Sequence, residues 1–157
     1  MQLTRAADYG VRVMVALAGS EVGSRVSLPE LTRSTGAPES FLSKVLQSLA
    51  HAGLISSRRG LGGGFEISQQ GREASIRAVV EAVDGAIALN VCLADGKACR
   101  RSAWCPAHPV WARAQQAMLE VLEGARMSEL ADQGAANEFV LVLKSCIPPA
   151  MTSPAAD

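Results

Sequence analysis

Three cysteines and one histidine lie within a single short stretch of the chain, and their side chains are suited to bind a metal. Six residues separate Cys92 from Cys99, five separate Cys99 from Cys105, and His108 follows after two more. Thiolates are soft ligands that select zinc, copper(I) or iron–sulfur clusters. Structural zinc sites place their cysteines in pairs roughly two to four residues apart, and this stretch has no such pair. The wider gaps therefore favour an iron–sulfur cluster, with zinc as the alternative.

The residues between these cysteines are typical of loops, so the backbone can fold the three sulfur atoms around one centre. The chain shows neither a signal peptide nor an apolar run of about 18 residues. We therefore expect a cytoplasmic protein, whose thiols are kept reduced and serve as ligands or redox-active groups. Cys146 lies outside this loop in an apolar segment, and a cysteine there is typical of a small buried apolar residue.

A second group of residues is suited to contact DNA. Pro38 is predicted to open a helix that ends before Gly53. The buried face of this helix is predicted to consist of Phe41, Leu42, Val45, Leu46, Leu49 and Ala52. The opposite face carries the polar side chains of Ser40, Ser43, Lys44 and Gln47. Such side chains can read base edges or contact phosphate, although a polar face is also typical of a helix surface in solvent.

A glycine-rich hairpin follows this helix and favours the DNA-binding interpretation. Its tip carries four glycines, at positions 60, 62, 63 and 64. Arg58 and Arg59 stand at the base of the tip, where they can insert into the minor groove or bind phosphate. Gly62 and Gly63 allow the tip to approach the sugar–phosphate backbone closely. No Lys-Ser or Lys-Thr pair follows the glycines, which excludes a nucleotide-binding P-loop.

Hydrophobic spacing and turn residues assign the other elements. Helices are predicted over roughly 4–18, 28–35, 38–52, 75–83, 106–123 and 127–132, and strands over 54–58 and 65–68. Thr4 is predicted to cap the first helix, and Ser27 with Glu30 to form a capping box at the second. Three helices followed by a glycine-rich hairpin are the layout of a winged helix-turn-helix. The predicted fold class is therefore mainly α with a small β-hairpin.

These elements divide the chain into four regions. Residues 1–84 are predicted to form the winged helix-turn-helix DNA-binding region, and 85–108 the cluster-binding loop. Residues 106–146 supply a dimerisation helix and a C-terminal packing segment, and 147–157 a disordered tail. A helix as long as 106–123 needs more apolar cover than one winged domain offers, so we expect it to join two copies in a homodimer.

Composition excludes several classes of protein. The chain has 157 residues, 48% of them apolar, with 15 basic and 15 acidic side chains, which excludes a disordered polyelectrolyte. Residues 1–65 nevertheless carry seven basic against four acidic side chains, a local excess that permits nucleic-acid binding. Neither a Ser-His-Asp set nor paired carboxylates are indicated. We therefore expect no enzyme, no small-molecule substrate and no membrane partner.

Five stretches of the chain resemble one family of bacterial regulators. They are Met1–Thr4, Asp8–Gly10, Gly53–Ser57, Arg59–Gly64 and the loop with three cysteines. Over about residues 1–135 the chain resembles the Rrf-two family, whose iron–sulfur members include IscR, NsrR and RirA. The resemblance implies a homodimeric repressor or activator that binds promoter DNA according to the state of an iron–sulfur cluster, and it strengthens the preference for a cluster over zinc.

The resemblance also implies two candidates for the fourth cluster ligand. In IscR-like members a histidine three positions after the last cysteine completes a two-iron, two-sulfur site, and His108 stands there. In NsrR-like members an aspartate in the first helix of the partner subunit completes a four-iron, four-sulfur site, and Asp8 stands there. His108 and the 2Fe–2S form are slightly favoured over 4Fe–4S because that ligand is local. A zinc-stapled regulator and a metal-free thiol switch remain the alternatives.

Overall fold

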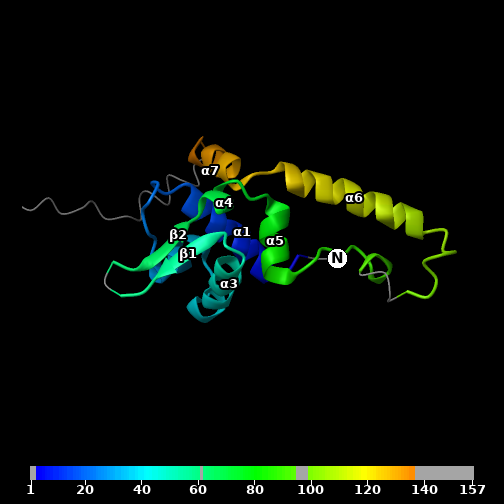
Figure 1. Ribbon diagram of the computed structural model, residues 1–157, viewed down its shortest axis with the longest axis horizontal. Helices are drawn as coiled ribbons and strands as arrows, with labels where there is room; N and C mark the ends of the chain where they lie inside the picture. Colours follow the sequence, from blue (N-terminus) through cyan, green and yellow to red (C-terminus); the bar gives the residue numbers. More distant parts are fainter. Residues whose placement is uncertain (1–2, 61, 95–98, 137–157) are drawn as a thin grey trace, which may run out of the picture.

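The computed structural model describes residues 3–60, 62–94 and 99–136. Helices α1 to α3 come first, a two-stranded hairpin follows, and further helices complete the chain (Figure 1). The elements are α1 Arg5–Ala18, α2 Leu28–Thr35, α3 Glu39–His51, β1 Ile55–Arg58, β2 Gly64–Ile67, α4 Gln69–Arg72, α5 Ile76–Asp84, the 3-10 turn η1 Val91–Leu93, α6 His108–Gly124 and α7 Met127–Ala136. The prediction of a mainly helical chain with one small hairpin is confirmed.

Local signals set the beginnings and ends of the first helices. The Thr4 hydroxyl accepts from the Ala7 amide at 3.2 Å and caps α1 as predicted. The capping box of α2 is present, and the Glu30 carboxylate accepts from the Ser27 amide at 2.7 Å. The Ser27 hydroxyl also donates to this carboxylate. The hydrogen bonds from the Ser27 hydroxyl and amide lower the pKa of Glu30. Gly36 ends α2 in the left-handed conformation at φ 69°, which glycine adopts without steric cost.

The core forms around α1, which packs against α2, α3, α5 and α7. Val13, Met14 and Leu17 of α1 are at most 1% exposed. Helix α3 contributes Leu42, Val45, Leu46 and Leu49. The predicted stripe on α3 was wrong at its two ends: Phe41 is 37% exposed and Ala52 lies outside the helix, exposed. Helical spacing alone assigned both to the core. Phe41 instead lies at the edge of α3 beside the Tyr9 ring of α1, and Ala52 follows the last helical residue.

The hairpin is anchored to the body at its base. β1 and β2 pair antiparallel, from Ile55 opposite Ile67 to Arg58 opposite Gly64. Val26, which precedes α2, exchanges backbone hydrogen bonds of 2.9 Å with Phe65 in β2. Gly71 of α4 packs against the backbone where β1 begins, so closely that an added Cβ would lie 2.0 Å from the Leu54 carbonyl oxygen. The hairpin therefore leaves the body from a fixed base.

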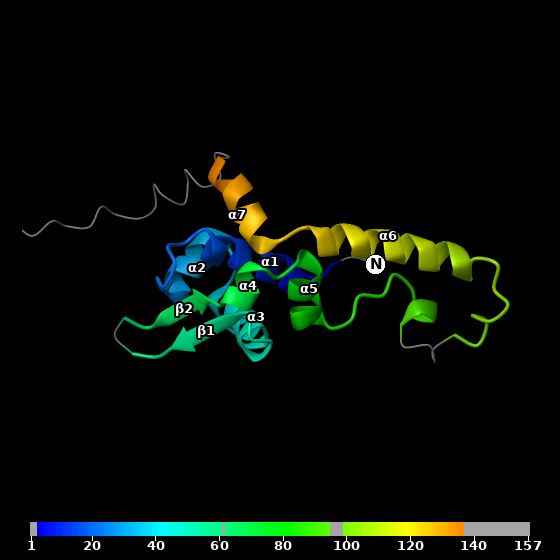
Figure 2. The same ribbon diagram turned by 45° about the horizontal axis from the view of Figure 1, so that its top comes forward.

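Helix α6 and the loop before it form an arm, and the other elements, which pack around α1, form the body. Figures 1 and 2 show α6 extending away from the body on the side opposite the hairpin tip. Met118, Leu119 and Leu122 of α6 pack against a small cluster with Val80 and Ile87. No residue of α6 is fully buried. The arm therefore has one covered side and one open side.

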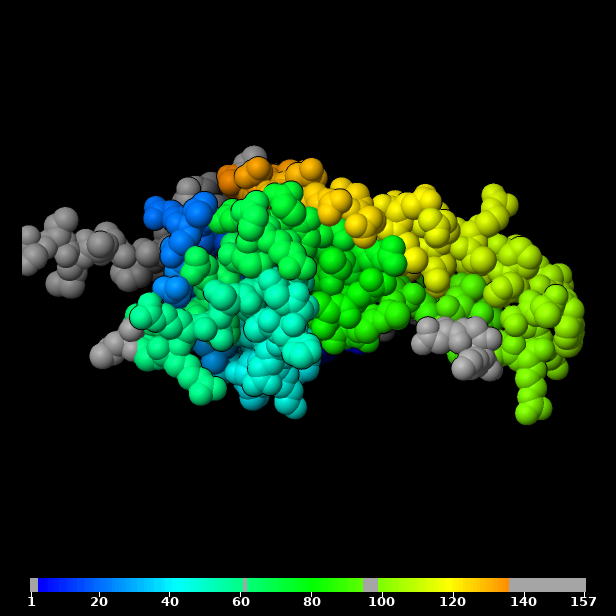
Figure 3. Space-filling model, in the orientation of Figure 1, coloured from blue at the N-terminus to red at the C-terminus, as the bar shows by residue number. Residues whose placement is uncertain are grey.

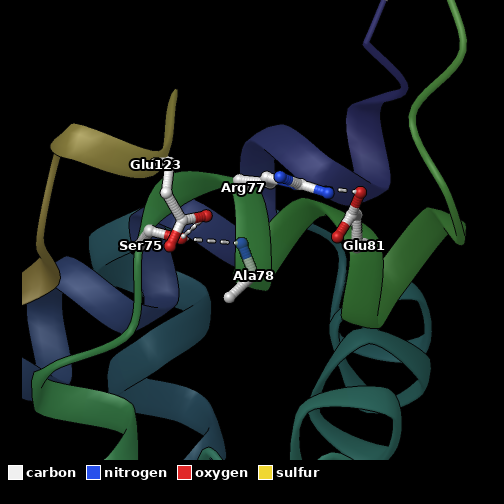
Figure 4. Close-up of polar contacts among 5 residues, drawn as sticks. All are labelled: Ser75, Arg77, Ala78, Glu81 and Glu123. Atoms are coloured by element: carbon white, nitrogen blue, oxygen red, sulfur yellow. Dashed lines mark hydrogen bonds and ion pairs between the residues drawn. The ribbon is translucent and has the colours of Figure 1, made fainter. Parts of the chain in front are cut away.

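A buried hydroxyl joins the arm to the body. Ser75 is 1% exposed, caps α5 by accepting from the Ala78 amide at 3.1 Å, and donates to the Glu123 carboxylate of α6 at 3.1 Å (Figure 4). One turn along α5, Arg77 pairs with Glu81 at 3.2 Å. The N-terminus of α5 and the C-terminus of α6 are thus tied together.

Two helix boundaries differ clearly from the sequence predictions. Helix α6 begins at His108 rather than Pro106, which leaves Pro109 in the first helical turn, where its missing amide costs nothing. Helix α7 continues to Ala136 rather than 132, and its buried residues Met127 and Ala131 lie within the predicted part. Among the described helices, none is both long and apolar enough to cross a membrane. The predicted packing segment after 136, Cys146 and the predicted tail lie outside the described residues.

The close contact at Gly71 generates a stability prediction. We expect Gly71→Ala to lower the free energy of unfolding by about 1–3 kcal/mol, because the new methyl group meets a backbone carbonyl that cannot move without shifting β1. Gly124→Ala is the matched control, since an added Cβ there has no atom within 4 Å, and it should leave stability unchanged or slightly raised. Urea unfolding measures both. Equal stability of the two variants would contradict the packing described here.

Candidate nucleic-acid interface and metal-binding loop

The polar side of α3 is available to a ligand. Ser40, Lys44 and Gln47 are exposed, as predicted, and lie on the side of the helix away from the core. Ser43 is half-buried, and its hydroxyl donates to the Glu39 carbonyl one turn earlier at 2.9 Å. Its donor is therefore used within the helix. Ser43 consequently offers a partner mainly an acceptor, whereas Lys44 and Gln47 can donate.

The tip of the hairpin has a backbone that approaches itself closely. The Gly63 amide donates to the Gly60 carbonyl at 2.9 Å. A Cβ on Gly63 would lie 2.4 Å from the Arg58 carbonyl oxygen, so only glycine fits there. Gly62 has φ 70°, a conformation that other residues rarely adopt. Gly62 and Gly63 therefore shape the tip, as well as keeping it free of side chains.

Positive charge gathers at this hairpin. Arg58 and Arg59 are exposed, and neither has an ion-pair partner within the part of the chain that the structure describes. Arg25 at the base is instead neutralised by Glu66 at 3.1 Å. Figure 3 shows the hairpin and α3 side by side on one face of the molecule. Two unpaired guanidinium groups beside a polar helix face form a surface suited to a polyanion.

The loop after α5 carries the predicted thiol ligands. Cys92 lies in η1, and Cys92, Cys99 and Cys105 are half-buried free thiols. Over the described ranges, the structure gathers no group of three His, Cys, Asp or Glu side chains at metal-binding distance. The loop therefore presents the soft donors that a cluster requires but does not hold them around one point.

His108 is the predicted ligand with the clearest structural signal. Its Nδ1 atom is buried and has no hydrogen-bond partner in the described part of the chain. Its backbone amide donates to the Cys105 carbonyl at 3.1 Å, so the histidine and the last cysteine are held in one turn. A buried imidazole nitrogen without a partner is costly, and a metal ligand bond would satisfy it. The donor set of the loop therefore fits a cluster in its chemistry.

Asp8, the other predicted ligand, lies elsewhere. It is exposed on the first turn of α1 and pairs with Arg12 at 2.9 Å. The structure does not group it with the cysteines of the same chain.

One contact that fixes the loop to the arm carries no signal in the sequence. Gln115 of α6 accepts from the Leu89 amide through its side-chain oxygen at 2.9 Å. The two residues are far apart along the chain, so no local pattern could reveal this hydrogen bond. It holds the beginning of the loop against α6.

Comparison with known proteins identifies the family of this chain. Residues 3–133 match the model of the Rrf2 family, which is described as iron-dependent transcriptional regulators. The chain belongs to the Rrf2 family. It is 30% identical to protein aau3 of Rhizobium meliloti, over 95% of this chain and 97% of that protein. It is also 29% identical to the HTH-type transcriptional regulator IscR of Vibrio vulnificus, over 83% of this chain and 77% of that protein.

A solved structure confirms the fold. CymR, the global cysteine regulator of B. subtilis, matches with a TM-score of 0.69 and 23% identity, over 85% of this chain and 98% of CymR. The winged helix-turn-helix prediction is therefore confirmed. The chain is a transcriptional regulator and not an enzyme, as the sequence indicated.

The hairpin arginines generate a binding prediction. We expect Arg58→Ala and Arg59→Ala each to weaken binding to duplexes of any sequence, and to reduce the slope of log affinity against log salt by about one, because each variant removes one phosphate contact. Arg77→Ala is the control, since Arg77 lies on α5 and is paired with Glu81 (Figure 4). Titration of a fluorescent duplex at several salt concentrations measures this. An unchanged slope in both hairpin variants would show that the hairpin arginines make no phosphate contact.

Proposed function

We propose that this regulator binds promoter DNA through α3 and the hairpin, and that an iron–sulfur cluster held by Cys92, Cys99 and Cys105 controls its affinity. The observation that carries the proposal is the loop between α5 and α6, where three half-buried free thiols precede a histidine with an unpartnered buried nitrogen. Similarity to IscR supports it. The site of action would be the cytoplasm, where bacterial promoters lie.

The ligand set explains why a cluster here would act as a sensor. Three thiolates and one weaker oxygen or nitrogen ligand leave one iron easier to displace, so a bound cluster supplies a centre that oxygen, nitric oxide or iron scarcity can alter. His108 is the favoured fourth ligand, because it follows Cys105 in the same turn. Asp8 of the partner subunit is the second candidate. The first choice corresponds to a 2Fe–2S site and the second to a 4Fe–4S site.

A thiol switch is the second candidate function. All three cysteines are free thiols that the structure does not gather, and the fold matches that of CymR, a cysteine regulator. In this case oxidation would join two of the loop cysteines in a disulfide, and reduction would restore the thiols. The zinc-stapled form uses the same ligands without redox chemistry.

The open side of α6 supports a homodimer. Val110 and Val121 are 64% and 73% exposed. Helical spacing places them on one side of α6 with Ala114 and Ala117, next to the side from which Met118 and Leu122 pack on the body. A stripe of small residues with two exposed valines would let a second helix approach closely. In two copies joined along α6, the two α3 helices, which we call the reading helices, would face major grooves about 34 Å apart.

The connection of the loop to α5 supports a route by which its thiols would influence DNA binding. The loop leaves the C-terminal end of α5 and ends at the N-terminus of α6. Drawing Cys92, Cys99 and Cys105 together would fix these two helix ends relative to each other. Helix α5 packs against both α1 and α3, so a change at the loop would reach α3 through packed contacts.

Metal and sulfide analysis tests the ligand assignment. Full-length protein purified without oxygen should be coloured and hold about two or four iron atoms with equal sulfide. Cys92→Ser, Cys99→Ser and Cys105→Ser should each lose most of the iron, whereas the control Cys146→Ser should keep it. Loss of iron in His108→Ala but not Asp8→Ala would assign the 2Fe–2S site, and the reverse result the 4Fe–4S site.

Two other results would overturn the cluster proposal. A colourless protein with one zinc per chain, lost in the same three cysteine variants, would establish the zinc-stapled form. A metal-free protein that gains a reversible disulfide among the loop cysteines after oxidant, seen by mass spectrometry, would establish the thiol switch.

A charge on the open side of α6 tests the dimer. Val121→Glu should raise the dimer dissociation constant at least about tenfold, because a carboxylate buried between helices has no partner there. Val22→Glu is the control, since Val22 is 88% exposed and lies in the turn between α1 and α2. Light scattering over a dilution series measures both. A wild-type monomer, or a Val121→Glu dimer of undiminished affinity, would rule out this interface.

A further inference from the structure

An aromatic side chain lies exposed at the edge of the reading helix. Phe41 is 37% exposed, while Leu42, Val45 and Leu46 on the same helix are at most 2% exposed. It belongs to the N-terminal half of α3, between the exposed Ser40 and Lys44. The other large apolar side chains of α3 are buried in the protein core. Phe41 is therefore the one that remains partly open to solvent, beside polar side chains.

Two contacts hold this ring in place. The Tyr9 ring from α1 meets Phe41 edge to face, with centroids 5.7 Å apart and an interplanar angle of 75°. The Arg12 guanidinium lies over the Tyr9 ring at 5.9 Å and is itself paired with Asp8. Phe41 is therefore positioned before any ligand arrives, so little side-chain freedom remains to be lost on binding.

The major groove offers one apolar feature for such a ring. Its base edges display hydrogen-bond donors and acceptors, with the exception of the C5-methyl group of thymine. A phenyl ring has no hydrogen-bonding capacity, so it cannot read the other groups. It can, however, cover a methyl group and remove it from water. An exposed phenylalanine beside Ser40 and Lys44 is thus matched to thymine.

We propose that Phe41 is a specificity-determining residue that reads a thymine methyl group in each half-site, with Tyr9 as its positioning residue. The proposal rests on the proposed DNA-binding function of α3. The polar neighbours on α3 read donors and acceptors, whereas Phe41 reads the methyl group.

The size of the effect follows from the buried group. Covering one methyl-sized group is worth ~0.8 kcal/mol, and ~1.4 kcal/mol corresponds to a factor of ten in affinity. Removal of the methyl group from one half-site should therefore weaken binding about fourfold. Removal from both half-sites of a dimer should weaken it about fifteenfold, because the two contacts add.

Replacement of thymine by deoxyuridine tests this directly, since it removes only the methyl group. Full-length protein first selects a duplex from a random library, and each thymine of the selected duplex is then replaced in turn. With the wild-type chain, at least one position per half-site should show the fourfold loss. With Phe41→Ala, binding should be weaker and that position should become insensitive to the replacement. Tyr9→Leu should reduce the sensitivity without abolishing binding.

Two control variants separate this contact from a general loss of binding. Lys44→Ala should weaken binding but keep the full deoxyuridine effect. Val22→Ala, on the exposed turn after α1, should change neither quantity. Thermal unfolding of each variant establishes that it is folded, and Phe41→Leu, which keeps an apolar side chain, should retain part of the effect if Phe41→Ala proves unstable.

The possible failures are distinguishable. If no duplex is selected, the DNA-binding function itself fails. If a duplex is selected and no thymine shows the effect, the methyl contact is absent. If Phe41→Ala weakens binding while every deoxyuridine effect persists, Phe41 contacts the sugar–phosphate backbone or only supports the fold. Either of the last two results overturns this inference and leaves the proposed function standing.

Discussion

The packing of α1 between α3 and α5 is the contact on which the other features depend. Val13, Met14 and Leu17 are enclosed on all sides, and the helices that carry the reading face and the arm both pack on α1. Protein interiors are as dense as organic crystals, so a displaced helix moves its neighbours instead of compressing them. Helix α3 therefore cannot change its place without α1, and α1 cannot move without α5.

The arm differs from this body in how it is held. Helix α6 contributes Met118, Leu119 and Leu122 to a small cluster, and the Ser75–Glu123 hydrogen bond fixes one of its ends. Near the middle of α6, Gln115 accepts from the Leu89 amide and joins the beginning of the loop to the helix. Regions with few buried contacts open at low free-energy cost. A body that moves as one unit and an arm with a lightly held loop suit a protein whose signal enters at the loop and is read at α3.

The parts of the fold that the sequence predicted depend on local chemistry. Thr4, Ser27 and Gly36 act on backbone groups within one turn of themselves, so spacing alone located the helix ends. Phe41 could not be placed in this way, because its exposure depends on where α1 and Tyr9 lie. Burial of Met127 and Ala131 against the body likewise depends on tertiary packing. The loop thiols were recognised by type and spacing, but the described part of the chain does not gather them around one point.

The affinity of one promoter duplex for the same preparation with and without its cluster tests the central claim most directly. Anaerobic titration should give dissociation constants that differ by about 5–150-fold, the range of ordinary allosteric coupling. The Cys99→Ser chain should show the cluster-free value throughout. Identical dissociation constants for the cluster-bound and cluster-free protein on every promoter tested would contradict control of DNA binding by the loop.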